Sequence, residues 1–99
     1  SMAAVILACG DRRQVYRHTQ VLIHQLMGGT GMAQQTDIEI AARHTAAMRA
    51  ELDELLAENG NLSAQEFHEL TERDCWCNAK RALELGLVDE VIAPSKKAL

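Results

Sequence analysis

The chain lacks the features that mark nucleic-acid-binding, membrane-spanning and secreted proteins. It has 99 residues and a net charge of −4, its Lys and Arg residues form no basic stripe, and Arg12-Arg13 is expected in a solvated turn. A nucleic-acid surface is therefore disfavoured. The apolar run from Met2 to Cys9 is far too short to span a bilayer, and it lacks the charged lead and cleavage pattern of a signal peptide. Neither nucleic acid nor a membrane is an expected partner.

The cysteines form no disulfide framework and no metal motif. Three of them, Cys9, Cys75 and Cys77, cannot all pair within one chain, and a reducing compartment suits them better than secretion. We therefore expect the cytoplasm. One residue separates Cys75 from Cys77, whereas structural zinc sites usually have about two to four between paired ligands. We expect no metal and no other cofactor, and we expect Trp76 to fill core space.

Turn and capping signals divide the chain into short elements around one long helix. That helix is expected from Thr36 to Asn59, opened by a Thr36-x-x-Glu39 capping box and closed by Gly60. Shorter helices are expected over residues 1–9, after a second capping box at Ser63-x-x-Glu66, and from Asn78 to near Gly86. Strands are expected over residues 14–16, 20–24 and 87–92. This pattern predicts one small α/β domain over residues 1–92 and a solvated tail over residues 93–99.

The long helix carries one apolar stripe. Its members recur at spacings of three and four: Ile38, Ala41, Thr45, Met48, Leu52 and Leu55. Such a stripe packs either on the helix's own sheet or on another subunit, and periodicity alone leaves both open. The glycines that precede the helix, Gly28, Gly29 and Gly31, match neither a phosphate loop nor a dinucleotide turn. They predict a mobile loop.

A hydroxyl, an imidazole and a carboxylate occur in chain order as Ser1, His24 and Asp74. Acyl transfer by serine needs these groups, because the imidazole must accept the hydroxyl proton and the carboxylate must orient the imidazole. The same three residue types occur in almost any protein, so the prediction of a triad depends on the segments around them. The other histidines, at positions 18, 44 and 68, lack such context and are expected to be exposed.

Those segments resemble the proteolytic subunit of the Clp protease, a self-compartmentalised, ATP-dependent serine protease. They are Gln34–Ile40 with Ala42-Arg43, Asp53–Ala57, Thr71-Glu72-Arg73-Asp74, and Ala82–Ile92. The resemblance runs from Ser1 to about Ile92 and covers the second half of that family's protomer. It implies an α/β fold of the crotonase-like spiral type found in the Clp proteolytic subunit, with the long helix projecting as a handle.

The resemblance also implies a role for each candidate residue. Ser1 would be the nucleophile, His24 the general base, and Asp74 the group that orients His24. The N–H of Met2 would be one oxyanion donor, while the family's second donor comes from a glycine segment upstream of this chain. Ser1-Met2 is also what a cleaved expression tag would leave, and this alternative stays open.

An assembly is implied as well. Glu72 and Arg73 would lie at the interface between stacked, heptameric rings of one or more kinds of subunit, and an AAA+ unfoldase would feed unfolded polypeptides to the chamber. Two other functions stay open. The first is a truncated, non-catalytic assembly subunit, because the family's N-terminal half is absent from this chain. The second is a crotonase-type acyl-CoA enzyme, because the ending Gly86–Val91 also occurs there.

Overall fold

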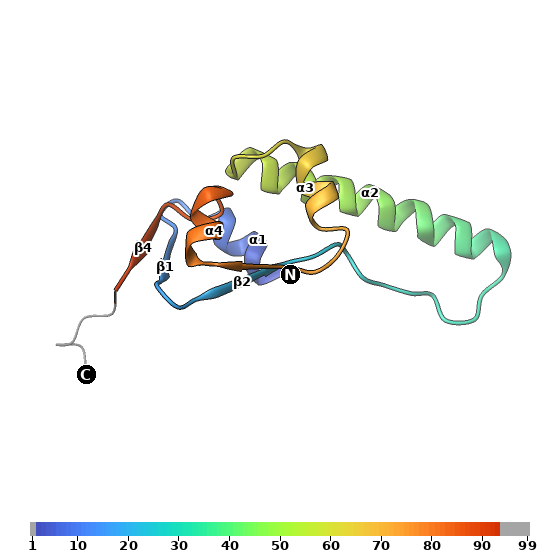
Figure 1. The fold of residues 1–99 in the computed structure, drawn as a ribbon. Helices are drawn as coiled ribbons and strands as arrows, with labels where there is room; N and C mark the ends of the chain where they lie inside the picture. Colours follow the sequence, from blue (N-terminus) through green and yellow to red (C-terminus); the bar gives the residue numbers. More distant parts are fainter. Residues whose placement is uncertain (1, 94–99) are drawn as a thin grey trace.

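The computed structural model describes residues 2–93 of the chain, in which short strands are interspersed among helices (Figure 1). The helices are α1 (Met2–Ala8), α2 (Gln35–Asn59), α3 (Ala64–Leu70) and α4 (Ala79–Glu84). The strands are β1 (Gln14–Tyr16), β2 (Gln20–Ile23), β3 (Cys75–Asn78) and β4 (Glu90–Ile92). The expected mixed α/β class is confirmed. Ser1 and residues 94–99 of the predicted tail lie outside the described residues.

The strands form two small sheets that join distant parts of the sequence. β1 pairs in parallel with β4, so that Val15 faces Val91. β2 pairs antiparallel with β3, so that Val21 faces Cys77 and Ile23 faces Cys75. Each sheet has two strands, and a crotonase-like spiral stays a prediction.

The core lies where α1, the end of α2, α3 and α4 meet these sheets. Its most deeply buried apolar side chains include Phe67, Leu85, Leu87 and Val88. Gly60 sits at the centre of this contact, because a Cβ there would lie 2.8 Å from the carbonyl oxygens of Leu56 and Leu85 and from the Phe67 ring. Only glycine allows the backbone segments after α2 and α4 to approach this closely.

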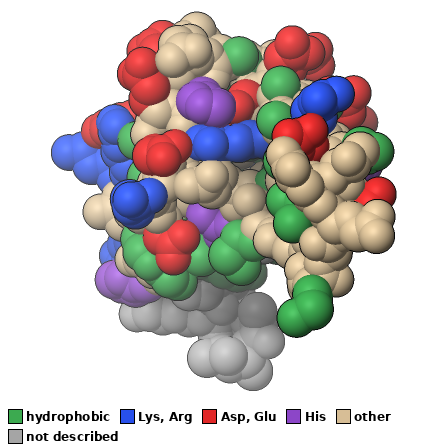
Figure 2. Space-filling view, turned by 90° about the vertical axis from the view of Figure 1, so that its right-hand side faces the viewer, with side chains coloured by type: hydrophobic (Ala, Val, Ile, Leu, Met, Phe, Trp, Pro, Cys, Tyr) green, Lys and Arg blue, Asp and Glu red, His purple; other side chains and the backbone are tan. Residues whose placement is uncertain are grey.

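The long helix projects from this core. In Figure 1 its first half extends well beyond the two sheets, and only its second half packs against α3 and α1. Asp53 and Leu56 are buried, whereas Ile38, Ile40 and Met48 are exposed. Figure 2 looks onto the projecting end and shows hydrophobic side chains exposed among charged ones. The predicted stripe is therefore unburied over the first half of the helix.

Two details of α2 differ from the prediction. The capping box at Thr36-x-x-Glu39 is wrong, because the helix already begins at Gln35; its N-cap is Gln34, whose side chain makes no capping hydrogen bond. Leu55, a member of the predicted apolar stripe, is 37% exposed, and the neighbouring Leu56, which was not assigned to the stripe, is buried. The predicted end at Asn59 with Gly60 as C-cap is confirmed.

The segment from Cys75 to Asn78 holds the largest error of prediction. It forms strand β3, which the sequence did not indicate, and strand alternation turns Cys75 and Cys77 toward one face and Trp76 toward the other. Trp76 is therefore 65% exposed and does not fill the core. The capping roles of Ser63 and Asn78 are both confirmed.

The last strand is shorter than expected. β4 begins at Glu90 and not at Leu87. Leu87 and Val88 are buried as expected of core residues, but they belong to the turn that follows α4. Gly86 opens this turn with a φ of 75°, and a Cβ there would lie 2.7 Å from the Asn61 side chain, so the turn needs glycine for both reasons.

Arg13 connects four parts of the chain and is not the solvated turn residue that was expected. Its side chain is 12% exposed. The guanidinium Nη1 donates to the carbonyl oxygens of Ala8, Asn59 and Gly86 at 3.0, 2.8 and 2.8 Å. Nε and Nη2 donate to the two carboxylate oxygens of Asp89 at 3.0 and 2.7 Å. One side chain thus ties together the ends of α1 and α2 and the turn that leads into β4.

The Arg13–Asp89 pair predicts an acid-sensitive contribution to stability. The hydrogen bonds from the Arg13 side chain and backbone lower the pKa of Asp89 from its ordinary 3.8 to about 2. Because this pKa is lower in the folded state, the contribution is complete above 3.8 and is lost as the pH falls through about 2. In urea titrations over this pH range, Asp89→Asn should therefore lose less stability with falling pH than the unaltered protein. The exposed Glu54→Gln is the control, and equal pH slopes for Asp89→Asn and the unaltered protein would contradict the prediction.

Candidate active site

The β2–β3 sheet places two of the predicted triad residues at the same edge. His24 directly follows β2 and Asp74 directly precedes β3. The antiparallel register pairs Ile23 with Cys75, so His24 and Asp74 come next at the same end of the ladder. Both side chains line one open depression, together with residues 25–27 and 71–73. Strand pairing is thus the reason why these two residues meet.

His24 is already oriented by the chain itself. Its Nδ1 lies 2.7 Å from the carbonyl oxygen of Gln25, a contact in which Nδ1 carries the proton and donates. Nε2 is then the basic nitrogen, which is the tautomer that a general base needs. Among the residues that the structure describes, no hydrogen bond joins His24 to Asp74. In this structure the Gln25 carbonyl thus accepts the hydrogen bond from Nδ1, and the orienting role of Asp74 stays a prediction.

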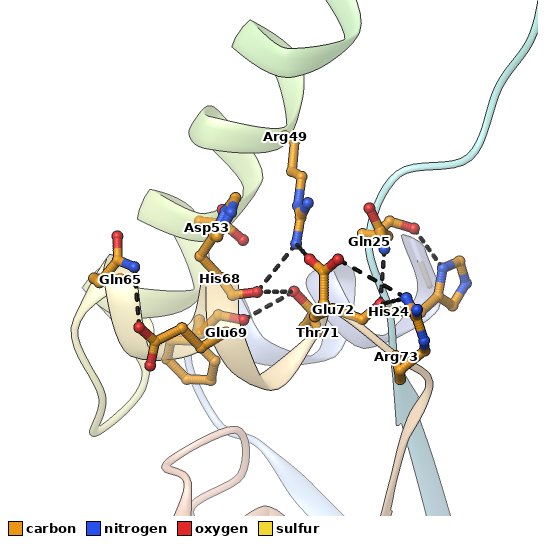
Figure 3. A network of polar contacts seen from close by, with 11 residues as sticks. His24, Gln25, Arg49, Asp53, Gln65, His68, Glu69, Thr71, Glu72 and Arg73 are labelled. Atoms are coloured by element: carbon orange, nitrogen blue, oxygen red, sulfur yellow. Dashed lines mark hydrogen bonds and ion pairs between the residues drawn. The ribbon is translucent and has the colours of Figure 1, made fainter.

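The loop over residues 71–74, which carries Asp74, is held from two sides (Figure 3). From α2, Arg49 Nη2 contacts a carboxylate oxygen of Glu72 at 3.2 Å and donates to the His68 carbonyl at 3.0 Å. From the end of β2, the Gln25 amide nitrogen Nε2 donates to the Glu72 carbonyl at 2.8 Å, and the Gln25 backbone N–H donates to Thr71 O at 3.1 Å. The position of Asp74 thus depends on both elements.

A buried carboxylate lies beside this loop. Asp53 of α2 is 5% exposed, and one of its oxygens lies 2.8 Å from His68 Nδ1 on α3. His68 was expected to be exposed, but it is only half exposed because it supplies the partner that a buried carboxylate requires. No sequence pattern indicated Asp53, since it stands beside the predicted stripe and looks like a surface charge of the helix.

An apolar cavity of about 240 Å³ lies next to His24. Its walls include Met2 and Val5 of α1, His24, and Leu52 and Leu56 of α2. Met2 is the first residue of α1, so its N–H has no acceptor within its own helix. The start of α1, which Ser1 precedes in the sequence, therefore borders the same cavity as the imidazole. Ser1 itself lies outside the described residues.

The residues predicted at a ring interface are at the surface. The side chains of Glu72 and Arg73 are 58% and 88% exposed, and Arg73 Nη1 donates to the Glu72 carbonyl oxygen at 3.0 Å. Within residues 2–93, no three His, Cys, Asp or Glu side chains gather around a possible metal position. No helix of the described part is long and apolar enough to cross a membrane.

The chain belongs to the Clp protease family, whose family model it matches over residues 1–95. It is 41% identical over 95 residues to the ATP-dependent Clp protease proteolytic subunit of Lactococcus lactis subsp. lactis (strain IL1403). It is 43% identical over 96 residues to the protein of the same name from Streptococcus pneumoniae (strain Hungary19A-6). These alignments cover 93% and 94% of this chain but 48% and 49% of the relatives. The chain thus spans about half the length of the curated relatives that it matches.

We expect Arg49 to hold the Asp74 loop from the side of α2. Arg49→Met keeps an unbranched stem but removes the contacts to Glu72 and to the His68 carbonyl. Hydrogen bonds to charged groups contribute about 1.5 to 3 kcal/mol, so the free energy of unfolding should fall by that amount, and amide exchange over residues 71–74 should accelerate. The control is Arg43→Met, whose side chain is 80% exposed and should contribute about 0.5 kcal/mol or less. Unchanged exchange in Arg49→Met would show that the loop is held without it.

Proposed function

We propose that the chain is the C-terminal half of a Clp-type serine endopeptidase subunit in which Ser1, His24 and Asp74 form the triad. The observation that carries the proposal is the β2–β3 register, which brings His24 and Asp74 to one end of a strand ladder in a member of the Clp protease family. The imidazole tautomer set by Gln25 supports it, because Nε2 is left as the base.

In this proposal, Nε2 of His24 accepts the hydroxyl proton of Ser1 as the serine oxygen attacks the peptide carbonyl. The N–H of Met2 donates a hydrogen bond to the oxyanion that forms. His24 then returns the proton to the leaving amine, and a water molecule, activated in the same way, releases the acyl group. A rotation of the His24 ring would transfer the Nδ1 hydrogen bond from the Gln25 carbonyl to the Asp74 carboxylate, which stabilises the imidazolium.

The cavity beside His24 supports a peptide substrate with an apolar side chain next to the cleaved bond. Its volume is about 240 Å³, and a cavity of about 150 Å³ lined by apolar side chains already accommodates benzene. Leu52, Leu56 and Val5 would contact such a side chain. Unfolded polypeptides expose apolar residues of this kind, in keeping with substrates delivered by an AAA+ unfoldase.

The unburied half of α2 supports assembly into larger particles. Ile38, Ile40 and Met48 leave apolar surface in water at a cost of about 25 cal/mol per Å², and burial against another subunit removes that cost. The proposed assembly is two stacked, heptameric rings of one or more kinds of subunit, with Glu72 and Arg73 at the ring–ring contact. The other half of the family's length would supply the second oxyanion donor. The free thiols suit a cytoplasmic location.

The two alternatives differ in their support. The acyl-CoA enzyme rested on the ending Gly86–Val91 alone, and the Clp protease match over residues 1–95 favours the protease. The non-catalytic assembly subunit is favoured by one observation, since no hydrogen bond joins His24 to Asp74 in the described part of the chain. Activity measurements on the assembled protein separate it from the protease.

His24→Ala and Asp74→Asn should each abolish peptidase activity while leaving the assembly intact. Each removes one triad role, and Asp-to-Asn exchange in such a triad typically lowers kcat by about 10⁴-fold. The measurements are cleavage of a fluorogenic peptide and sedimentation of the assembled protein, with the exposed His18→Ala and Asp11→Asn as controls outside α2. Peptide cleavage retained by His24→Ala would refute the triad. An unaltered assembly that neither cleaves peptide nor reacts with a fluorophosphonate would favour the non-catalytic subunit.

Arg73→Ala should weaken ring stacking and peptidase activity together. Arg73 stands directly before Asp74, so a contact made by Arg73 across the rings would also order the loop that orients His24. Sedimentation and peptide cleavage should fall in parallel, whereas the similarly exposed Arg12→Ala should change neither. Fully active single rings would refute the coupling, and unchanged double rings with unchanged activity would make Arg73 an ordinary surface residue.

A further inference from the structure

Two thiols lie side by side on β3, directly after Asp74. The Sγ atoms of Cys75 and Cys77 are 3.7 Å apart. Strand alternation turns both toward the face that carries Val21 and Ile23, where Cys77 is fully buried and Cys75 is only partly buried. The third thiol, Cys9, is exposed and belongs to the segment after α1, where it accepts a hydrogen bond from Asn59.

We propose that Cys75 and Cys77 form a redox modification site that hydrogen peroxide converts to an intrastrand disulfide. This chemistry needs one accessible thiol that reacts with peroxide and one protected thiol that stays reduced until the second step, and the two thiols differ in this way. Burial, reinforced by the hydrogen bond with Cys75, raises the pKa of the Cys77 thiol to about 12, which keeps it protonated and unreactive toward peroxide at neutral pH. Cys75 is partly exposed, as reaction with peroxide requires, so Cys75 is oxidised first. Cys77 then attacks the oxidised sulfur of Cys75.

The reaction balances as two steps. The Cys75 thiolate attacks one peroxide oxygen, the O–O bond breaks, and the hydroxide that leaves takes up a proton to give water, which leaves a sulfenic acid on Cys75. The Cys77 sulfur then attacks Cys75 Sγ, the S–O bond breaks, and the leaving hydroxide takes the Cys77 proton. Two thiols have lost two electrons, and one peroxide has become two water molecules.

The disulfide would distort the strand. An S–S bond is about 2.05 Å long and usually joins Cα atoms about 4.4 to 6.8 Å apart, whereas residues two apart in a strand are separated by about 6.6 Å. The separation of the two Cα atoms is therefore near the upper limit for a disulfide, and formation of the bond shortens β3. This shortening loosens the pairing of Cys75 with Ile23 and of Cys77 with Val21. A strained disulfide of this kind is readily reduced by thiols. Because the same ladder ends at His24 and Asp74, its consequence for activity rests on the proposed function.

The test uses the purified full chain, brief exposure to hydrogen peroxide, alkylation of the remaining thiols, and mass spectrometry of the protein and its peptides. The peptide that contains Cys75 and Cys77 should lose two hydrogen atoms and regain them with dithiothreitol. Cys9→Ser should behave like the unaltered protein, and Cys75→Ser should not lose the hydrogens. Cys77→Ser should stop at a sulfenic acid on Cys75 that dimedone traps.

Several results would overturn the proposal. They are a disulfide that involves Cys9 or joins two chains, a sulfinic acid as the first stable product at Cys75, and no loss of hydrogen in the unaltered protein. The last of these is decisive even if the variants fold poorly. Amide exchange over residues 20–24 should accelerate in the oxidised protein and recover on reduction. Unchanged exchange would refute the distortion of the ladder, and this readout does not depend on peptidase activity.

Discussion

The fold depends on a nearly buried guanidinium group. Arg13 donates to three main-chain carbonyls, those of Ala8, Asn59 and Gly86, and to the carboxylate of Asp89. These acceptors stand at the ends of elements, where carbonyl groups lack partners within their own helix. A planar, multiply donating group can satisfy them together, whereas a lysine ammonium would reach fewer of them in that geometry. The ends of α1 and α2 and the entry to β4 are thereby fixed relative to one another.

The candidate site is built on this frame by strand pairing and by contacts from the long helix. The β2–β3 ladder determines that His24 and Asp74 share one edge. The loop after α3 is held by hydrogen bonds to the end of α3 itself, and Arg49 and Gln25 add contacts to Glu72 from α2 and from the end of β2. The chemistry of the site and the position of α2 are therefore linked through a few polar contacts at the surface of the core.

Local signals predicted two of the helix caps correctly, although the capping box at Thr36 was wrong. The caps at Ser63 and Asn78 were predictable because each needs only the next few backbone N–H groups. Strand β3 was not, since Cys-Trp-Cys-Asn has little β-branched character and becomes a strand through pairing with β2, which also turns Trp76 outward. His24 and Asp74 became candidate site residues through the family resemblance. Arg49 and Asp53 were missed because their roles depend on partners from α3 and its loop, which sequence spacing does not reveal.

The projecting helix also has a mechanical consequence. α2 has 25 residues, a rod of about 37 Å at roughly 1.5 Å per residue. It is attached to the core over its second half, where Asp53 contacts His68 about 27 Å from the start of the helix. Such a rod acts as a lever, because a tilt of about 5° at the attachment displaces the far end by about 2 Å. Small rearrangements beside the Asp74 loop are thereby magnified at the tip, and a load applied to the tip returns to the attachment as torque.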